Sequence, residues 1–127
     1  GSQPAVFRFP GGSNTGYLKR SVFDSIVPEL NSRGYQYIDW NVESGDTGKV
    51  YPDSADVSKR ILSQCEDRIK NYKKKSCVVL MHDAEAKKGY IGTTLREIIP
   101  KLKAMGYSFE SLNKYAPVVQ FRKFTLV

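Results

Sequence analysis

The sequence is poor in the residues that build metal centres and disulfide frameworks. It has one histidine and two cysteines among 127 residues, whereas a catalytic zinc site needs three protein ligands and a disulfide framework needs several cysteine pairs. Cys65 and Cys77 are too far apart for a CxxC site, and we expect both to be thiols of the core. The sequence also lacks an apolar run near the roughly 18 residues that cross a bilayer, and its N-terminus does not resemble a signal peptide.

Nucleic-acid motifs are absent as well. The net charge of +7 favours an anionic partner or a soluble surface, but the basic residues are scattered, apart from Lys73–Lys75. That run ends a predicted helix, where cations complement the helix C-terminus. Because Gly-rich phosphate loops, zinc-finger spacings and aromatic RNA-binding motifs are missing, we expect no nucleic-acid partner. The hydrophobic fraction of 40% and the charged fraction of 26% predict one globular domain.

A helix-then-strand unit occurs twice. Residues 26–38 read IVPELNSRGYQYI and residues 98–110 read IIPKLKAMGYSFE, with matching isoleucine, proline, leucine and Gly-Tyr positions. Each glycine suits the left-handed position that ends a helix, and each is followed by an alternating aromatic strand. Pro28 and Pro100 lie inside the expected helices, where proline predicts a break or kink. A repeated helix-strand unit indicates βαβ architecture and a parallel sheet.

The middle of the chain predicts another such unit. Asp53 or Ser54 is suited to cap a helix. An apolar stripe follows at a spacing of four, and consists of Val57, Ile61, Cys65, Ile69 and Tyr72. Residues 77–81 are an apolar run typical of a strand buried on both faces, and residues 5–7 give a first strand. The predicted order is β-α-β-α-β-α-β, with residues 118–124 as a candidate edge strand.

Reactive groups follow the predicted strands, at the ends where parallel α/β proteins place their chemistry. The first strand delivers Arg8 and then Pro10–Ser13, the second delivers Asp39–Asp46, and the third delivers His82 and Asp83. Histidine beside carboxylates can be held protonated and donate to a leaving group, and arginine can orient a carboxylate. The chain's single histidine is assigned to this acid–base role, so no other histidine is left to activate a serine, and a serine-hydrolase triad is not predicted. The set therefore predicts half of an acid–base active site.

Each of these residues also has a structural interpretation. His82 can be a hydrogen-bonded residue at a strand end, and Arg8 can be part of a structural ion pair. Asp39 and Asp46 can cap loops. Trp40 can belong to the core instead of a substrate platform. Gly11 and Gly12 can serve only to turn the chain. Their shared placement is what favours a functional face.

Three segments carry a resemblance to a known family. They are FRFPGGS at residues 7–13, DWNVESGD at residues 39–46 and VVLMHD at residues 78–83. In this order and spacing they resemble the last three of the five motifs of the NodB-homology polysaccharide deacetylases, the fourth carbohydrate esterase family. The resemblance implies α/β architecture of a distorted, incomplete (β/α) barrel with parallel strands. Residues 1–127 would be the C-terminal half of that domain.

The resemblance also implies roles for the catalytic residues. Arg8 would orient the catalytic base, and His82 would be the general acid, with Asp46 supporting it. In the family a backbone N–H of the third motif helps to hold the oxyanion, and here Gly11 stands where many members have tyrosine. Thr47 stands where many members have a tryptophan that lines the pocket.

The remaining implied residues line the substrate pocket. Leu80 would receive the methyl of the acetyl group. Pro10 of the third motif and Trp40 of the fourth would lie beside it. The resemblance thus predicts a pocket in which an acetamide is held close to the general acid.

The first two motifs of the family are missing from the sequence. They would carry the base aspartate and the ligands of a divalent metal, usually zinc, so we expect no metal ligands on this chain. The intact domain would be a hydrolase acting on N-acetylglucosamine polymers, with peptidoglycan favoured over chitin or acetylated xylan. We expect an extracellular or cell-surface parent protein. The chain alone is expected to be inactive.

A different class of function remains open. A non-catalytic carbohydrate-binding or interaction module would also explain the missing ligands, whereas the retained Arg8, Asp46 and His82 favour the enzyme. A half barrel exposes sheet edges and apolar strand faces. We therefore expect this chain to associate with itself or to require the missing N-terminal half.

Overall fold

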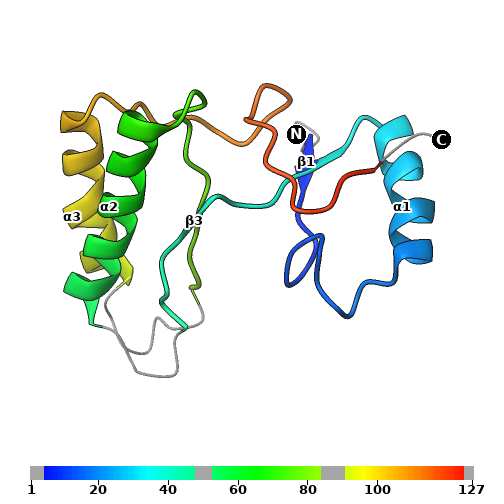
Figure 1. The fold of residues 1–127 in the computed structure, drawn as a ribbon, viewed down its shortest axis with the longest axis horizontal. Helices are drawn as coiled ribbons and strands as arrows, with labels where there is room; N and C mark the ends of the chain where they lie inside the picture. The colour runs from blue at the N-terminus through cyan, green and yellow to red at the C-terminus, as the bar shows by residue number, and fades with distance from the viewer. Residues whose placement is uncertain (1–4, 48–52, 84–90, 125–127) are drawn as a thin grey trace. The chain divides into compact units, whose positions relative to one another are not determined.

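The computed structural model describes residues 5–47, 53–83 and 91–124. The elements, in order, are β1 (Val6–Phe7), α1 (Arg20–Ser32), β2 (Gln36–Tyr37), β3 (Val42–Glu43), α2 (Ser54–Asn71), β4 (Val79–Leu80) and α3 (Ile91–Ala104) (Figure 1). The chain forms two compact units: a first unit of residues 1–39 and 110–127, and a second unit of residues 40–109. Each unit is described by itself.

The chain is mixed α/β with parallel strands, as the sequence predicts. Strand β1 pairs in parallel with β2, and β3 pairs in parallel with β4. The predicted order is wrong, because the described elements run β-α-β-β-α-β-α. Strand β3 lies in a segment predicted to be loop, and residues 107–124 contain no strand. A strand forms where a neighbour can receive its backbone hydrogen bonds, and that neighbour cannot be read from the segment alone.

Helices α1 and α3 both run through their prolines. Pro28 lies inside α1 and Pro100 inside α3, so neither helix breaks at its proline, and the kink named as the alternative stays a prediction. Proline removes one hydrogen bond of the helix ladder. Packing on the buried faces, which include Val27 in α1 and Ile98 in α3, is sufficient to keep each helix continuous.

The helix ends of the repeated unit are the same in both copies. Gly34 and Gly106 have φ angles of 84° and 100°, which confirms the left-handed position predicted for each glycine. In each copy the following tyrosine N–H donates to the carbonyl five residues earlier. The distances are 2.9 Å for Tyr35 to Leu30 and 3.1 Å for Tyr107 to Leu102. These bonds turn the chain out of the helix.

The first unit has an aromatic core beneath α1. Its buried residues are Phe9, Phe23, Val27 and Tyr37. The rings of Phe23 and Tyr37 meet edge to face, with centroids 5.5 Å apart, a favourable arrangement for aromatic pairs. The predicted edge strand at residues 118–124 is wrong. That segment nevertheless runs beside the end of β2, where Asp39 N–H donates to the Val119 carbonyl at 2.7 Å.

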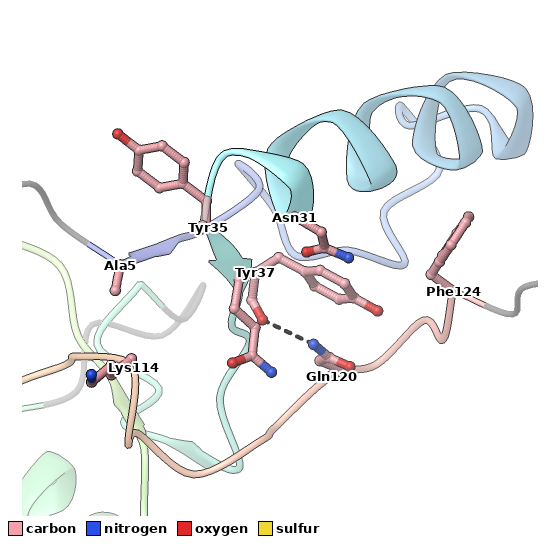
Figure 2. A pocket seen from close by; sticks show the side chains of 9 residues that line it. Ala5, Asn31, Tyr35, Tyr37, Lys114, Gln120 and Phe124 are labelled. Atoms are coloured by element: carbon pink, nitrogen blue, oxygen red, sulfur yellow. Dashed lines mark hydrogen bonds between the residues drawn. The ribbon is translucent and has the colours of Figure 1, made fainter.

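A cavity of about 470 Å³ opens in the first unit (Figure 2). Its wall includes the carbonyl of Tyr37, which accepts a hydrogen bond from Gln120 Nε2 at 3.1 Å. The lining residues are Ala5, Asn31, Gly34, Tyr35, Gln36, Tyr37, Lys114, Gln120 and Phe124. None of the residues that the sequence predicts for the site lines this cavity.

The second unit has an aliphatic core between α2, α3 and strand β3. Asp53 caps α2 by accepting the Asp56 N–H at 2.8 Å, as predicted. The predicted stripe is buried in its first three members, whereas Ile69 is half-buried and Tyr72 is exposed. The core residues are Val42, Val57, Ile61, Cys65, Ile98 and Leu102. No helix in the described ranges is long and apolar enough to span a membrane.

Candidate active site

The register of β3 and β4 brings two loop segments to one edge of the second unit. Val42 pairs with Val79 and Glu43 pairs with Leu80. The side chain of Asn41 reinforces this register, because its Oδ1 accepts the Val78 N–H at 2.7 Å. Since the strands are parallel, the residues that follow Glu43 and Leu80 emerge at the same edge.

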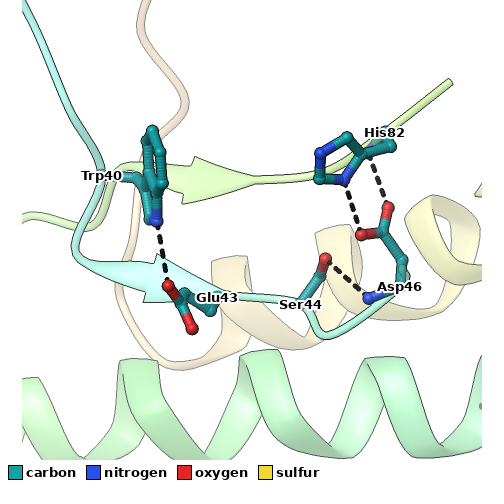
Figure 3. Close-up of polar contacts among 5 residues, drawn as sticks. All are labelled: Trp40, Glu43, Ser44, Asp46 and His82. Atoms are coloured by element: carbon teal, nitrogen blue, oxygen red, sulfur yellow. Dashed lines mark hydrogen bonds and ion pairs between the residues drawn. The ribbon is translucent and has the colours of Figure 1, made fainter. Parts of the chain in front are cut away.

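Asp46 and His82 meet at this edge (Figure 3). His82 Nδ1 lies 2.8 Å from Asp46 Oδ1, and the His82 backbone N–H donates to Asp46 Oδ2 at 2.6 Å. Asp46 is 3% exposed, whereas the side chain of His82 is 40% exposed. One carboxylate therefore holds both the main chain and the ring of the histidine, at the boundary between core and solvent. Asp46 follows β3 and not the strand before it, which corrects its predicted position in the topology.

This geometry fixes how the imidazole presents its nitrogens. A carboxylate only accepts hydrogen bonds, so Nδ1 is the nitrogen that carries hydrogen when it faces Asp46 Oδ1. The other nitrogen, Nε2, lies on the opposite side of the ring. It is the atom at which His82 can donate or accept a proton. The pair has the geometry of a histidine oriented by a buried acid.

The pKa of Asp46 lies below its ordinary value. Burial raises the pKa of Asp46. The hydrogen bonds from the His82 ring, from the His82 backbone and from Ser44, together with the charge of His82, lower the pKa by more than burial raises it. The Asp46 N–H also donates to Ser44 Oγ at 3.3 Å. The carboxylate is therefore ionised at neutral pH and can stabilise a positive charge on the ring.

We expect this carboxylate to contribute to stability in a pH-dependent way. The folded pKa of Asp46 is depressed below 3.8, so the unfolded chain binds a proton first as the pH falls. The contribution is present above the ordinary pKa and is lost as the pH falls through the folded value. Urea unfolding at several pH values should show less loss of stability below pH 4 for Asp46→Asn than for the wild type. Equal slopes in the two proteins would contradict this expectation.

Gly45 allows the turn that returns Asp46 to the strand edge. Its φ angle is 70°, a left-handed conformation that glycine adopts without steric cost. A Cβ built on Gly45 would lie 2.9 Å from Nη1 of Arg60. The backbone conformation and the guanidinium packed over it both favour glycine here.

Replacing Gly45 by alanine is expected to cost about 1–2 kcal/mol of stability, the usual cost of the left-handed region for an L-residue. It should also shift the NMR signals of the His82 ring, because Asp46 follows the strained position directly. Gly106→Ala is a matched control: it has the same kind of φ angle and no atom near the new Cβ. The control should lose similar stability with the His82 signals unchanged. Unchanged His82 signals in Gly45→Ala would show that the turn does not position the pair.

Trp40 lies at the start of the second unit and is 8% exposed. Its Nε1 donates to Glu43 Oε1 at 3.2 Å (Figure 3). The backbone of Glu43 is held in turn by Gln64, whose Oε1 and Nε2 bond the Glu43 N–H and carbonyl at 3.1 and 2.8 Å. Trp40 is thus buried as a core residue would be, and its role toward a substrate stays a prediction.

The two other predicted residues of this unit differ in exposure. Leu80 is half-buried in β4, and Thr47 is exposed.

The other predicted site residues lie in the first unit. Arg8, Pro10 and Gly11 are all exposed, on the segment that follows β1. Gly11 has a φ angle of 77°, so glycine suits this turn. The turn is closed by the Gly12 N–H, which donates to the Phe9 carbonyl at 2.8 Å.

A buried aspartate holds this segment in place. Asp39 is 1% exposed, and its carboxylate accepts from the Ser13 N–H at 2.9 Å, from Ser13 Oγ at 2.5 Å and from the Phe121 N–H at 2.8 Å. Ser13 Oγ in turn accepts the Arg122 N–H at 3.0 Å. Asp39 thereby ties the end of β2 to the segment that carries Arg8 and to the C-terminal segment.

Sequence reasoning missed Gln64, which lies on α2 and bonds the backbone of Glu43. The sequence gives no signal for this contact, because its partner lies 21 residues away. Asp39 and Ser44 belong to the segment that the sequence singles out, and both are buried.

The described residues do not fit a metal centre. Within these ranges no three histidine, cysteine, aspartate or glutamate side chains come together as ligands. In the described part of the chain the acidic partner of the His82 ring is Asp46, at 2.8 Å.

Comparisons with known proteins find similar folds among solved structures. No family model and no curated protein matches the sequence. The catalytic domain of peptidoglycan N-acetylglucosamine deacetylase from Eubacterium rectale ATCC 33656 matches 93% of this chain and 51% of its own, at a TM-score of 0.76 and 28% identity. The chain is similar to deacetylase catalytic domains. A CE4 esterase from Streptococcus mutans matches 83% of this chain and 42% of its own, at a TM-score of 0.62 and 29% identity.

A third structure shares the fold. The polysaccharide deacetylase from Bacillus cereus has a TM-score of 0.65 at 24% identity, covering 94% of this chain and 53% of its own. The chain thus spans about half the length of the proteins it matches. Closure of its strands into a barrel stays a prediction.

Proposed function

We propose that this chain forms part of a hydrolase that removes acetyl groups from N-acetylglucosamine polymers, with peptidoglycan as the favoured substrate. The observation that carries the proposal is the two-point contact of buried Asp46 with partly exposed His82. A carbohydrate-binding surface has no need of a histidine oriented in this way. The similarity to a peptidoglycan deacetylase domain and to a CE4 esterase supports the same substrate class.

In the proposed reaction His82 acts as general acid. Water adds to the acetamide carbon, the C–N bond breaks, and the departing nitrogen needs a proton to leave as an amine. His82 Nε2 supplies that proton, while Asp46 keeps the ring oriented and favours its charged form. The products are acetate and a glucosamine residue. The His82 side chain is 40% exposed, which is compatible with contact to a polymer substrate.

The remaining residues have proposed roles that follow the same chemistry. Arg8 would orient the carboxylate that acts as base, because guanidinium binds carboxylate in bidentate fashion. The Gly11 N–H would help to stabilise the oxyanion. Pro10, Leu80 and Trp40 would line the pocket for the acetamide. Of these, Leu80 belongs to the same strand segment as His82, which places it two residues before the acid.

The proposal includes a divalent metal, with zinc favoured, held by residues other than those described here. Such a metal would supply Lewis-acid chemistry to the acetamide. The proposal also includes an extracellular or cell-surface location. Both remain proposals to be tested on the natural polypeptide that carries these residues.

Acetate release and polysaccharide binding should be measured together on that polypeptide. Peptidoglycan, chitin oligomers and acetylated xylan would each be incubated with and without added zinc. We expect acetate and new primary amines from peptidoglycan above all. Binding without acetate release under every condition would instead identify a non-catalytic carbohydrate-binding module, and the absence of both would refute the proposal.

A further inference from the structure

The two cysteines, which the proposed function does not use, converge in the second unit. Cys65 lies on α2 and is fully buried in the aliphatic core, and Cys77 is half-buried and packs against the same core just before β4. The Tyr107 hydroxyl lies between their segments. Its oxygen is 3.3 Å from Cys77 Sγ and 2.9 Å from the Cys65 carbonyl oxygen. Both cysteines are free, and Cys77 packs against the core to which Cys65 belongs.

The surroundings make the two thiols unequal. The hydrogen bond from Cys65, opposed by burial and assisted by the Tyr107 hydroxyl and the charge of Arg68, lowers the pKa of Cys77 to about 6. The same hydrogen bond, together with burial, raises the pKa of Cys65 well above its ordinary value. Cys77 is therefore both the more acidic and the more accessible of the two thiols, and Cys65 is the less acidic and the buried one.

We propose that Cys65 and Cys77 form a thiol–disulfide exchange site that closes to an internal disulfide. The Cys77 thiolate attacks one sulfur of a small-molecule disulfide, whose S–S bond breaks and releases one thiolate. Cys65 then loses its proton to that leaving thiolate and attacks the Cys77 sulfur, which displaces the second half of the small disulfide as a thiolate that takes a proton from water. Two protein thiols are oxidised to one disulfide, and the small disulfide is reduced to two thiols.

Burial of Cys65 is compatible with this sequence of steps. Only Cys77 must meet the external disulfide, because Cys65 reacts with a sulfur already brought to it by its neighbour. The pair thus divides into an attacking and a resolving cysteine. The resulting bond would join α2 to the chain five residues before His82.

The test is exposure of the reduced protein to oxidised glutathione, followed by intact mass and peptide mapping. In the wild type we expect a Cys65–Cys77 disulfide without retained glutathione. Cys65→Ala should accumulate a glutathione adduct on Cys77, and Cys77→Ala should stay unmodified while it remains folded by circular dichroism. The reaction rate of the wild type should level off above about pH 6, the pKa of Cys77, and this inflection should move to higher pH in Cys65→Ala, which lacks the S–H donor.

Three results on the wild type alone would overturn the proposal. One is a stable glutathione adduct on Cys77 with no internal disulfide, because Cys65 would then be out of reach. Another is equal reaction of both cysteines, which indicates opening of the core. The third is the absence of any reaction until denaturant is added. None of these outcomes depends on deacetylase activity.

Discussion

Replacing His82 by alanine is expected to lower the kcat for acetate release by about 10²–10⁴-fold, the usual contribution of a positioned general acid. KM should change much less, because the departing nitrogen needs the proton in the transition state. The fold should survive, since the bond from the residue-82 backbone N–H to Asp46 Oδ2 does not depend on the side chain. The measurement is steady-state kinetics on peptidoglycan fragments by the natural polypeptide.

Asp46→Asn gives the matching test of orientation. An amide in place of the carboxylate removes the charge that favours imidazolium and offers a donor to Nδ1 instead of an acceptor. We expect a loss of kcat of about 10²-fold or more. Activity of both variants within a few-fold of the wild type would show that this pair is structural.

Replacing Asp39 by alanine is expected to destabilise the first unit by about 3–5 kcal/mol. The carboxylate accepts three hydrogen bonds while being 1% exposed. A hydrogen bond to a charged group contributes about 1.5–3 kcal/mol, and a buried donor left without a partner costs about 1–3 kcal/mol. Denaturant unfolding gives the stability. Hydrogen exchange at the Ser13 and Phe121 amides reports the loss locally.

Asp24→Ala serves as the control for Asp39. Asp24 is also an aspartate of the first unit, but its ion pair with Arg20 is exposed, at 3.0 Å on one face of α1. Such helix pairs contribute only about 0.3–0.5 kcal/mol. If Asp39→Ala costs no more than this control, or if the two amides exchange no faster, the carboxylate does not hold the segment of Arg8.

The features that could be predicted from the sequence are those with local causes. The capping of α2 by Asp53 depends on atoms three residues apart. The burial of Val57, Ile61 and Cys65 follows from a spacing of four on one helix. The left-handed glycine at each helix end likewise requires only neighbouring residues.

The features that the sequence did not reveal depend on distant partners. Strand β3 exists because β4 receives its backbone bonds, and only two residues of each take part. The three bonds of Asp39 join positions 26 and 82 residues away. The approach of Asp46 to His82 was suggested by the family motifs, whereas its form, with one oxygen on the ring and one on the backbone, required the structure.

The helix ends at Gly34 and Gly106 show what the sequence repeat means. Their hydrogen bonds close within six residues, so neither turn requires anything from the rest of its unit. The side chain of the tyrosine that follows each glycine can consequently make different contacts in the two units. Tyr35 lines the cavity of the first unit, and Tyr107 contacts Cys77 in the second. The two segments therefore end their helices in the same way and use the following tyrosine for different contacts, so the sequence repeat specifies a backbone turn and not a shared function.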